Sequence, residues 1–160
     1  MDSVVGEVEA AYRRYLRDYP LQVQEHLAGR SLDLRGLSFW HFPLLIGMGH
    51  AASLIDHDSF AATFSSSYHA YRDQGWDGGI RLDEVEVEVA APDWVAMRAR
   101  GTRLDHAGGA IDTWHTTYLM RRGDDGWRCF ALVAPPDEGA PMASWRKWLA
   151  AIATPGSTSA

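Results

Sequence analysis

The sequence predicts an α+β domain in which helices pack on one face of an antiparallel sheet. In residues 82–91, three valines alternate with three glutamates, a period of two that is typical of a half-buried strand. Before this region, apolar side chains instead recur at helical spacing. Turn residues divide the chain from residue 82 onward into four strands of an antiparallel meander, and they lie at 91–93, 106–109 and 123–126.

The composition favours a single domain and argues against several classes of function. The chain has 160 residues and a net charge of −6, and its arginines never form a run, which is atypical of a nucleic-acid-binding surface. The single cysteine, Cys129, excludes an internal disulfide and a cysteine-rich metal site. No apolar run is long enough to cross a bilayer. We therefore expect a cytoplasmic protein with no metal, no cofactor, no nucleic acid and no membrane partner.

Two helices and a strand are expected in the first third of the chain. Apolar and aromatic side chains form a helical stripe over residues 5–19. Pro20 is expected to end this helix, because proline disfavours helical geometry in the residue before it. Residues 21–27 then predict a second short helix. The aromatic and aliphatic residues 37–46 predict a strand, in which Pro43 favours an edge position or a bulge.

A short returning strand at 51–55 leads to a third helix, for which residues 56–59 offer N-caps. Four aromatic residues at helical spacing should face the sheet: Phe60, Phe64, Tyr68 and Tyr71. The folded domain is expected to cover residues 4–134. Residues 135–153 predict a linker and a C-terminal amphipathic helix, and residues 154–160 predict a disordered tail.

This order of elements, with the proline-broken strand and the closing hairpin RRGDDGWRCFALV, resembles the nuclear transport factor two-like superfamily. The same fold is also called SnoaL-like or ketosteroid isomerase-like, and the resemblance covers residues 4–134. It implies a cone-shaped curved antiparallel sheet wrapped around the N-terminal helices, and a homodimer. In this family the cone often holds a small apolar ligand, but it also serves as a protein-binding module, so the fold does not settle the function.

The strand at residues 111–120 can present either of two faces to such a cavity. Laying the segment TYLMRRGDDGW on the matching ketosteroid isomerase segment implies that Tyr118 faces the cavity, where the isomerase has a carboxylic acid. Side chains that alternate with Tyr118 then face inward too, together with a tyrosine from the first helix. The residues expected to contact a ligand are Tyr12, Tyr15, Phe42, Trp114, Thr116, Tyr118 and Met120.

The isomerase mechanism itself does not carry over. The position of its general base, immediately before a proline, is occupied by Phe42, which cannot take a proton. His41 titrates near neutrality, but regular alternation points it away from the cavity unless a bulge at Pro43 turns it inward. Asp112 and Tyr118 share a face but lie about 20 Å apart at roughly 3.3 Å per residue, so they cannot form a direct dyad. The candidate catalytic residues are His41, Asp112 and Tyr118.

Three functions remain open. The first is a domain that binds a small apolar or aromatic ligand in a hydroxyl-lined pocket. The second is an isomerase, cyclase or dehydratase that uses His41 or Asp112 as a base, with Tyr118 or Tyr15 as hydrogen-bond donor. The third is a closed-core protein-interaction module, which a pocket filled by Met97, Met120 and Phe130 would favour.

Overall fold

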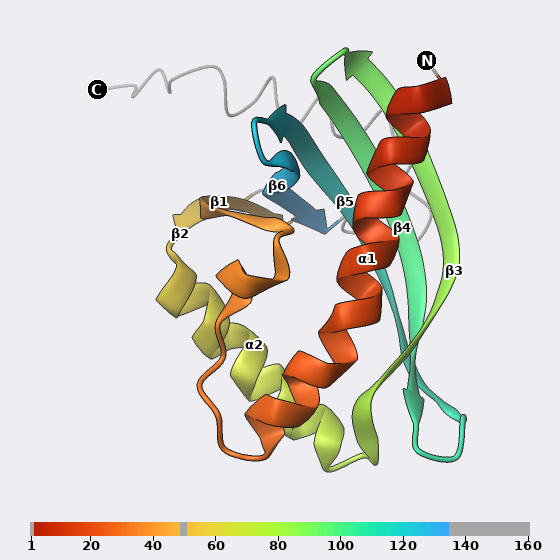
Figure 1. The fold of residues 1–160 in the computed structure, drawn as a ribbon. Coiled ribbons are helices and arrows are strands. Elements are labelled where there is room, and N and C mark those ends of the chain that lie inside the picture. The colour runs from red at the N-terminus through yellow and green to blue at the C-terminus, as the bar shows by residue number, and fades with distance from the viewer. Residues whose placement is uncertain (1, 49–50, 135–160) are drawn as a thin grey trace.

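The computed structural model describes residues 2–48 and 51–134 of the chain. Two α-helices, a short 3₁₀ turn (η1) and six strands follow one another (Figure 1). Their bounds are α1 Asp2–Leu27, η1 Leu34–Leu37, β1 Trp40–Met48, β2 Ala51–Ile55, α2 His57–Arg72, β3 Trp76–Ala91, β4 Trp94–Asp105, β5 Ala110–Gly123 and β6 Gly126–Ala134. The linker and helix expected at 135–153 and the tail expected at 154–160 lie outside the described residues.

The six strands form one curved sheet in the order β2-β1-β6-β5-β4-β3. The four-stranded meander β3–β6 is antiparallel throughout, as its turn residues predict. β1 pairs with β6 in parallel, so the sheet is mixed rather than wholly antiparallel. In Figure 1, α1 runs alongside the β3–β5 part of the sheet and α2 lies below β1 and β2. The predicted α+β class is confirmed.

The prediction that Pro20 ends the first helix is wrong, because α1 continues through it to Leu27. The buried stripe of the helix also continues, since Tyr19 and Val23 are both buried. Burying two such side chains contributes about 1.5–3 kcal/mol each, which offsets a proline penalty of about 3 kcal/mol. Pro20 packs against Gly78 of β3, where an added Cβ would lie 2.9 Å from the Pro20 Cα.

β1 is interrupted at Pro43, and the pairing with β6 shifts register between Trp40 and Leu45. β1 is not an edge strand of the sheet, but β2 pairs with it only from Leu44 onward, so Pro43 lies just before that ladder. The predicted bulge is therefore confirmed, because proline has no N–H to donate to a regular ladder. This irregularity lets Trp40, which is buried, turn its ring toward Tyr15 of α1.

α2 begins at the N-cap Asp56, whose carboxylate accepts a hydrogen bond of 2.8 Å from the backbone N–H of Ser59. Its aromatic stripe faces the interior as predicted. The Phe60 ring lies 5.1 Å from the ring of Trp40, and the Tyr68 ring lies 5.4 Å from that of Trp76. α2 thereby closes one end of the space between α1 and the sheet.

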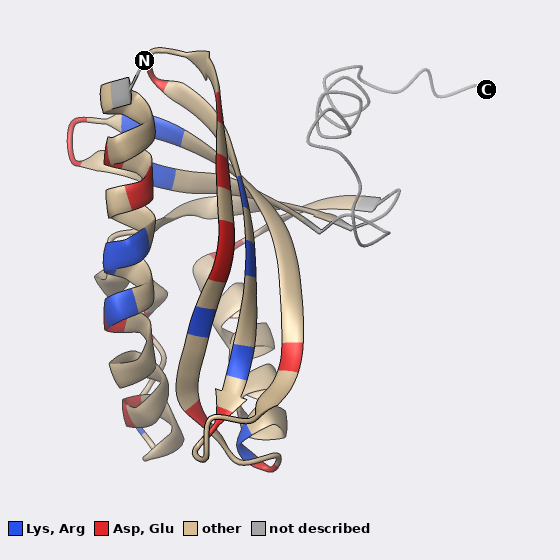
Figure 2. Ribbon diagram, turned by 90° about the vertical axis from the view of Figure 1, so that its right-hand side faces the viewer, with Lys and Arg blue, Asp and Glu red and all other residues tan. Residues whose placement is uncertain are grey.

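The two faces of the sheet differ in polarity. The main core lies between the helices and the concave face and is rich in aromatic rings. On the opposite face, charged residues of neighbouring strands pair across the ladder, as Arg98 of β4 does with Glu86 of β3. Figure 2 shows acidic and basic positions on neighbouring strands of the sheet. A small apolar cluster shares this outer face and consists of Ala96, Leu119 and Ala131 with Leu45 and Phe130 packed against them.

Candidate functional site

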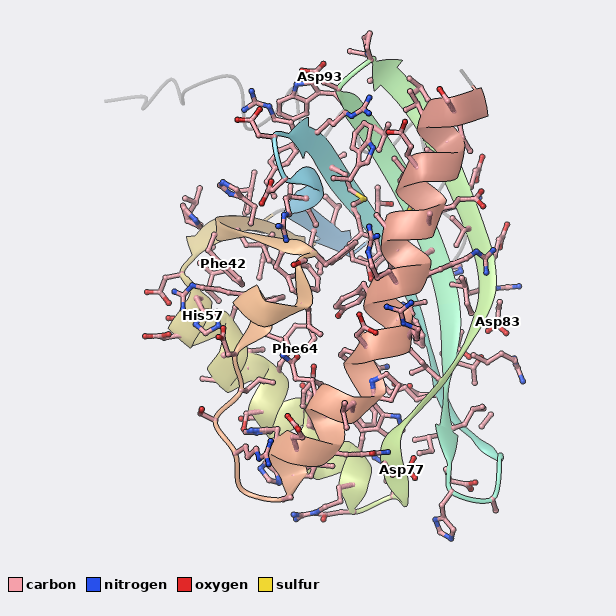
Figure 3. All side chains as sticks on the ribbon, viewed as in Figure 1. Phe42, His57, Phe64, Asp77, Asp83 and Asp93 are labelled. Atoms are coloured by element: carbon pink, nitrogen blue, oxygen red, sulfur yellow. The ribbon has the colours of Figure 1, made fainter. Side chains whose placement is uncertain are left out.

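A cavity of about 110 Å³ lies between α1, α2 and the concave face of the sheet. Both helices and every strand except β2 contribute to its wall. Figure 3 shows Phe64 pointing from α2 toward α1, into this interior. The lining residues are Tyr12, Tyr15, Leu16, Tyr19, Trp40, Phe64, Ile80, Arg103, Trp114, Thr116, Tyr118 and Leu132.

Three tyrosines reach the cavity from α1, because positions 12, 15 and 19 follow the helical repeat and share one face. The hydroxyl oxygens of Tyr12 and Tyr118 are 3.5 Å apart, at the outer limit of a hydrogen bond. The rings of these two residues lie 5.4 Å apart. Tyr12 and Tyr118 of β5 are thus in contact, and the α1 tyrosines and Tyr118 form one continuous part of the wall.

These tyrosine hydroxyls remain protonated at neutral pH. Burial raises the pKa of Tyr118 to about 12, while Tyr12 opposes that rise through its hydrogen bond. Burial also raises the pKa of Tyr12 and Tyr15 well above the usual value, and repulsion between neighbouring tyrosines adds to the rise. The hydroxyls can therefore donate and accept hydrogen bonds, but they are poorly suited to act as bases.

The indole of Trp114 occupies space that Gly101 leaves free. Gly101 of β4 is the cross-strand partner of Trp114 of β5. A Cβ on Gly101 would overlap the six-membered ring of Trp114. The missing side chain allows the indole to lie close over β4, where it forms part of the cavity wall.

One charged group lines the cavity, and it belongs to a cluster on β4, β5 and α2. Arg103 donates from Nη1 to the two carboxylate oxygens of Asp112, at 2.9 and 3.2 Å. Its guanidinium lies 4.4 Å from the centre of the Tyr71 ring and 5.2 Å from that of Trp114. The Tyr71 hydroxyl donates to the same carboxylate at 2.6 Å. The arginine is thus held between two rings and one carboxylate.

Two buried polar atoms in or beside the cavity make no hydrogen bond of normal geometry, although each interacts weakly with a tyrosine hydroxyl of α1, Tyr15 in one case and Tyr19 in the other. They are Nε1 of Trp40, which lines the cavity beside Tyr15, and the hydroxyl oxygen of Tyr68 on α2. Leaving such a group without a partner costs about 1–3 kcal/mol. A weakly paired donor in a cavity wall is therefore a place where a bound molecule or a water can gain a stronger hydrogen bond.

The structure brings five of the seven expected ligand-contacting residues together in the cavity wall: Tyr12, Tyr15, Trp114, Thr116 and Tyr118. The other two lie elsewhere. Phe42 packs beside the His57 ring at 5.2 Å, near the start of α2 (Figure 3). Met120 is fully buried but is not part of the wall.

The three candidate catalytic residues are not brought together. His41 is exposed and lies in a surface groove with Asp125 and Arg128, so the bulge at Pro43 does not turn it toward the cavity. Asp112 is held by Arg103 and Tyr71 at one end of the cavity. Tyr118 alone of the three lines the wall.

Sequence reasoning missed Trp40, Phe64, Tyr19 and Arg103 as lining residues. Arg103 could have been found, since it alternates in phase with Ala99 and Gly101, opposite to the outward-facing Arg98 and Arg100. Trp40 gave no such signal, because the bulge at Pro43 disrupts the period of two.

Within residues 2–48 and 51–134, no group of His, Cys, Asp or Glu side chains is placed to hold a metal ion. No helix of that region has the length and apolar character needed to span a bilayer.

The family model described as NTF2-like protein (DUF6841) matches residues 6–137. The chain belongs to this NTF2-like family. The fold agrees with this family, because an NTF2-like protein with a cystatin-like fold is among the solved structures similar to the chain. None of the curated proteins is significantly similar to the chain.

Solved structures of low sequence identity share the fold. An NTF2-like protein with a cystatin-like fold from Novosphingobium aromaticivorans is 18% identical with a TM-score of 0.58, over 89% of this chain and 88% of that one. A ketosteroid isomerase-like protein from Erwinia carotovora atroseptica is 18% identical with a TM-score of 0.50, over 80% and 92%. An NTF2-like protein of unknown function from Shewanella oneidensis is 13% identical with a TM-score of 0.55, over 81% and 97%.

Proposed function

We propose that this NTF2-like protein binds a small, flat aromatic molecule in the cavity between α1 and the sheet. The observation that carries the proposal is the aromatic wall of the cavity, in which the buried Nε1–H of Trp40 makes no hydrogen bond of normal geometry and has only a weak interaction with the Tyr15 hydroxyl. Aromatic walls with a few polar groups that fix orientation are typical of small-molecule sites. A ligand with one hydrogen-bond acceptor would satisfy this donor.

The size of the cavity favours a molecule with a single ring. Its volume is about 110 Å³. An engineered protein cavity of about 150 Å³ holds benzene, so the smaller volume here leaves room for no more than one ring, and any substituent must project out of the cavity. Arg103, whose side chain is 20% exposed, lines the cavity where it approaches the surface, so a ring substituent can extend in that direction.

The three residues whose side chains would fill the pocket of a closed-core module do not line the cavity. Met97 and Met120 are fully buried but do not line the cavity, and Phe130 packs on the outer face, where its ring lies 4.6 Å from that of Trp94. This arrangement supports a ligand-binding domain over a closed-core interaction module.

Isothermal titration calorimetry with benzamide tests the proposal. Leu16→Phe adds volume at the cavity wall and should weaken benzamide binding at least about tenfold, since an occupied cavity cannot also hold the ring. Leu54→Phe is the matched control, because Leu54 is 68% exposed on β2 and should leave binding unchanged. Equal binding by both variants, or no binding by the unmodified protein at millimolar concentration, would refute the proposal.

Acid–base catalysis is a second candidate, supported by the hydrogen bond of 2.6 Å from the Tyr71 hydroxyl to Asp112. A carboxylate beside a hydroxyl donor can move a proton from carbon. The two hydrogen bonds from Arg103 weigh against this role, because they occupy both carboxylate oxygens that would take up the proton. Deuterium incorporation into the methyl group of acetophenone, measured by NMR in D₂O, tests this candidate. Exchange no faster than in buffer, or equally fast in Asp112→Asn, would exclude it.

A further inference from the structure

Among the described residues that line the cavity, Arg103 is the one with a charged side chain. The rest of the wall is aromatic, aliphatic or hydroxyl-bearing. A guanidinium in such a wall prefers a carboxylate ligand, because the two planar groups can form two parallel hydrogen bonds. A neutral group interacts with it more weakly. The chemistry of this side chain therefore bears directly on the class of ligand.

The guanidinium is held in one orientation. Tyr71 lies on it at 4.4 Å and Trp114 at 5.2 Å, measured from Cζ to the ring centres. Both hydrogen bonds to Asp112 come from Nη1, at 2.9 and 3.2 Å. The edge formed by Nε and Nη2 takes no part in the contact with Asp112. That edge can offer two parallel N–H groups to a second carboxylate.

The positive charge is placed on the cavity side of the ion pair. Arg103 lines the cavity, whereas Asp112 does not and its side chain is 36% exposed. The charge also reaches hydroxyls of the cavity wall. Burial raises the pKa of Tyr118 and Tyr19, and the charge of Arg103 opposes the rise at both. The cavity is thus more favourable to an anion than its neutral walls suggest.

We propose that Arg103 recognises the carboxylate of a single-ring aromatic acid, with the ring held against the aromatic wall that the α1 tyrosines and Tyr118 share. Asp112 and Tyr71 are positioning residues that fix the guanidinium. This assignment rests on the ligand site proposed above and adds the charge of the ligand to it.

Benzoate and benzamide test the assignment, because they have nearly the same size and shape but differ in charge. Calorimetry of the unmodified protein should give benzoate an affinity at least about tenfold higher than benzamide, as expected for a charge-assisted pair. Arg103→Gln should abolish this preference. Arg100→Gln, on the same strand but the outer face, is the matched control and should keep the preference.

Arg103→Gln leaves the Asp112 carboxylate without its cation, and an unpaired carboxylate is itself destabilising, so a second variant is needed. Arg103→Gln combined with Asp112→Asn removes both charges, and it should also bind benzamide and benzoate equally. Retention of the benzoate preference in the double variant would overturn the assignment. Equal affinity of the unmodified protein for the two compounds would overturn the assignment alone, whereas binding of neither compound would overturn the proposed ligand site as well.

Discussion

The contact between Gly101 and Trp114 allows a sharp test of how the cavity wall is built. Replacing Gly101 by alanine adds a methyl group that would overlap two atoms of the Trp114 ring and approach a third to 2.7 Å. The indole must move, because the added methyl group is fixed to the backbone of the adjacent strand and cannot rotate away from the ring. Its displacement should also disturb the stacking with Arg103, whose guanidinium lies 5.2 Å from the ring centre.

The expected loss of stability follows from these contacts. Overpacking of this kind costs about 1–3 kcal/mol, and weakening the cation–π contact adds about 0.5–1 kcal/mol. The lower backbone entropy of alanine in the unfolded chain returns about 0.5–1 kcal/mol. Gly101→Ala should therefore reduce the free energy of unfolding by about 2 kcal/mol. With Trp114→Ala already present the clash is absent, and Gly101→Ala should be neutral or slightly stabilising.

The measurement is urea unfolding followed by far-ultraviolet circular dichroism for the four proteins of this double-mutant cycle. A loss of about 2 kcal/mol lowers the urea midpoint by about 1 M for a slope of about 2 kcal/mol/M. Gly6→Ala is the matched control, because Gly6 is exposed on α1 and an added Cβ meets nothing within 4 Å. An equal effect of Gly101→Ala with and without Trp114 would refute the account, since the cost would then not arise from the ring.

Three further predictions concern the fold. All six tyrosines have a raised pKa, chiefly through burial, so stability should be intact below about pH 10 and fall as pH rises toward 12. Tyrosinate absorbance should appear together with loss of circular dichroism, and ionisation near pH 10 in the folded protein would contradict this. Gly78→Ala should be at least about 1 kcal/mol more destabilising in urea than Gly108→Ala: both positions have positive φ, but only Gly78 contacts Pro20. Asp56→Ala should lower the free energy of unfolding by about 1 kcal/mol through loss of the hydrogen bond to Ser59, and an unchanged urea midpoint would exclude a capping role.

Much of the fold could be predicted from local patterns. The alternation of valine and glutamate in β3 and the turn residues after it are confirmed by the antiparallel ladder from β3 to β6. The aromatic stripe of α2 is likewise confirmed by its packing on Trp40 and Trp76. These patterns succeed because each depends on the geometry of a single element.

The candidate site was only partly predictable. Alternation along β5 placed Trp114, Thr116 and Tyr118 on one face, and these three residues do share the cavity wall. His41 and Phe42 could not be placed in the same way, because the register shift at Pro43 breaks the period on which such reasoning depends. Arg103 has the correct phase on β4, but its position between Tyr71 and Trp114 depends on two other elements.

The sequence by itself determined which residues face inward along regular elements, because side-chain direction repeats every two residues in a strand and every 3.6 in a helix. Only the tertiary structure decided that α1 continues through Pro20, that β1 runs parallel to β6, and that Trp40 Nε1 is buried without a hydrogen bond of normal geometry. Each of these results from contacts between residues far apart in the chain, whose packing energy outweighs local preference. The tertiary structure likewise decided the position of the Arg103 charge in the cavity wall, since side chains from α2 and β5 that no local pattern connects hold it there.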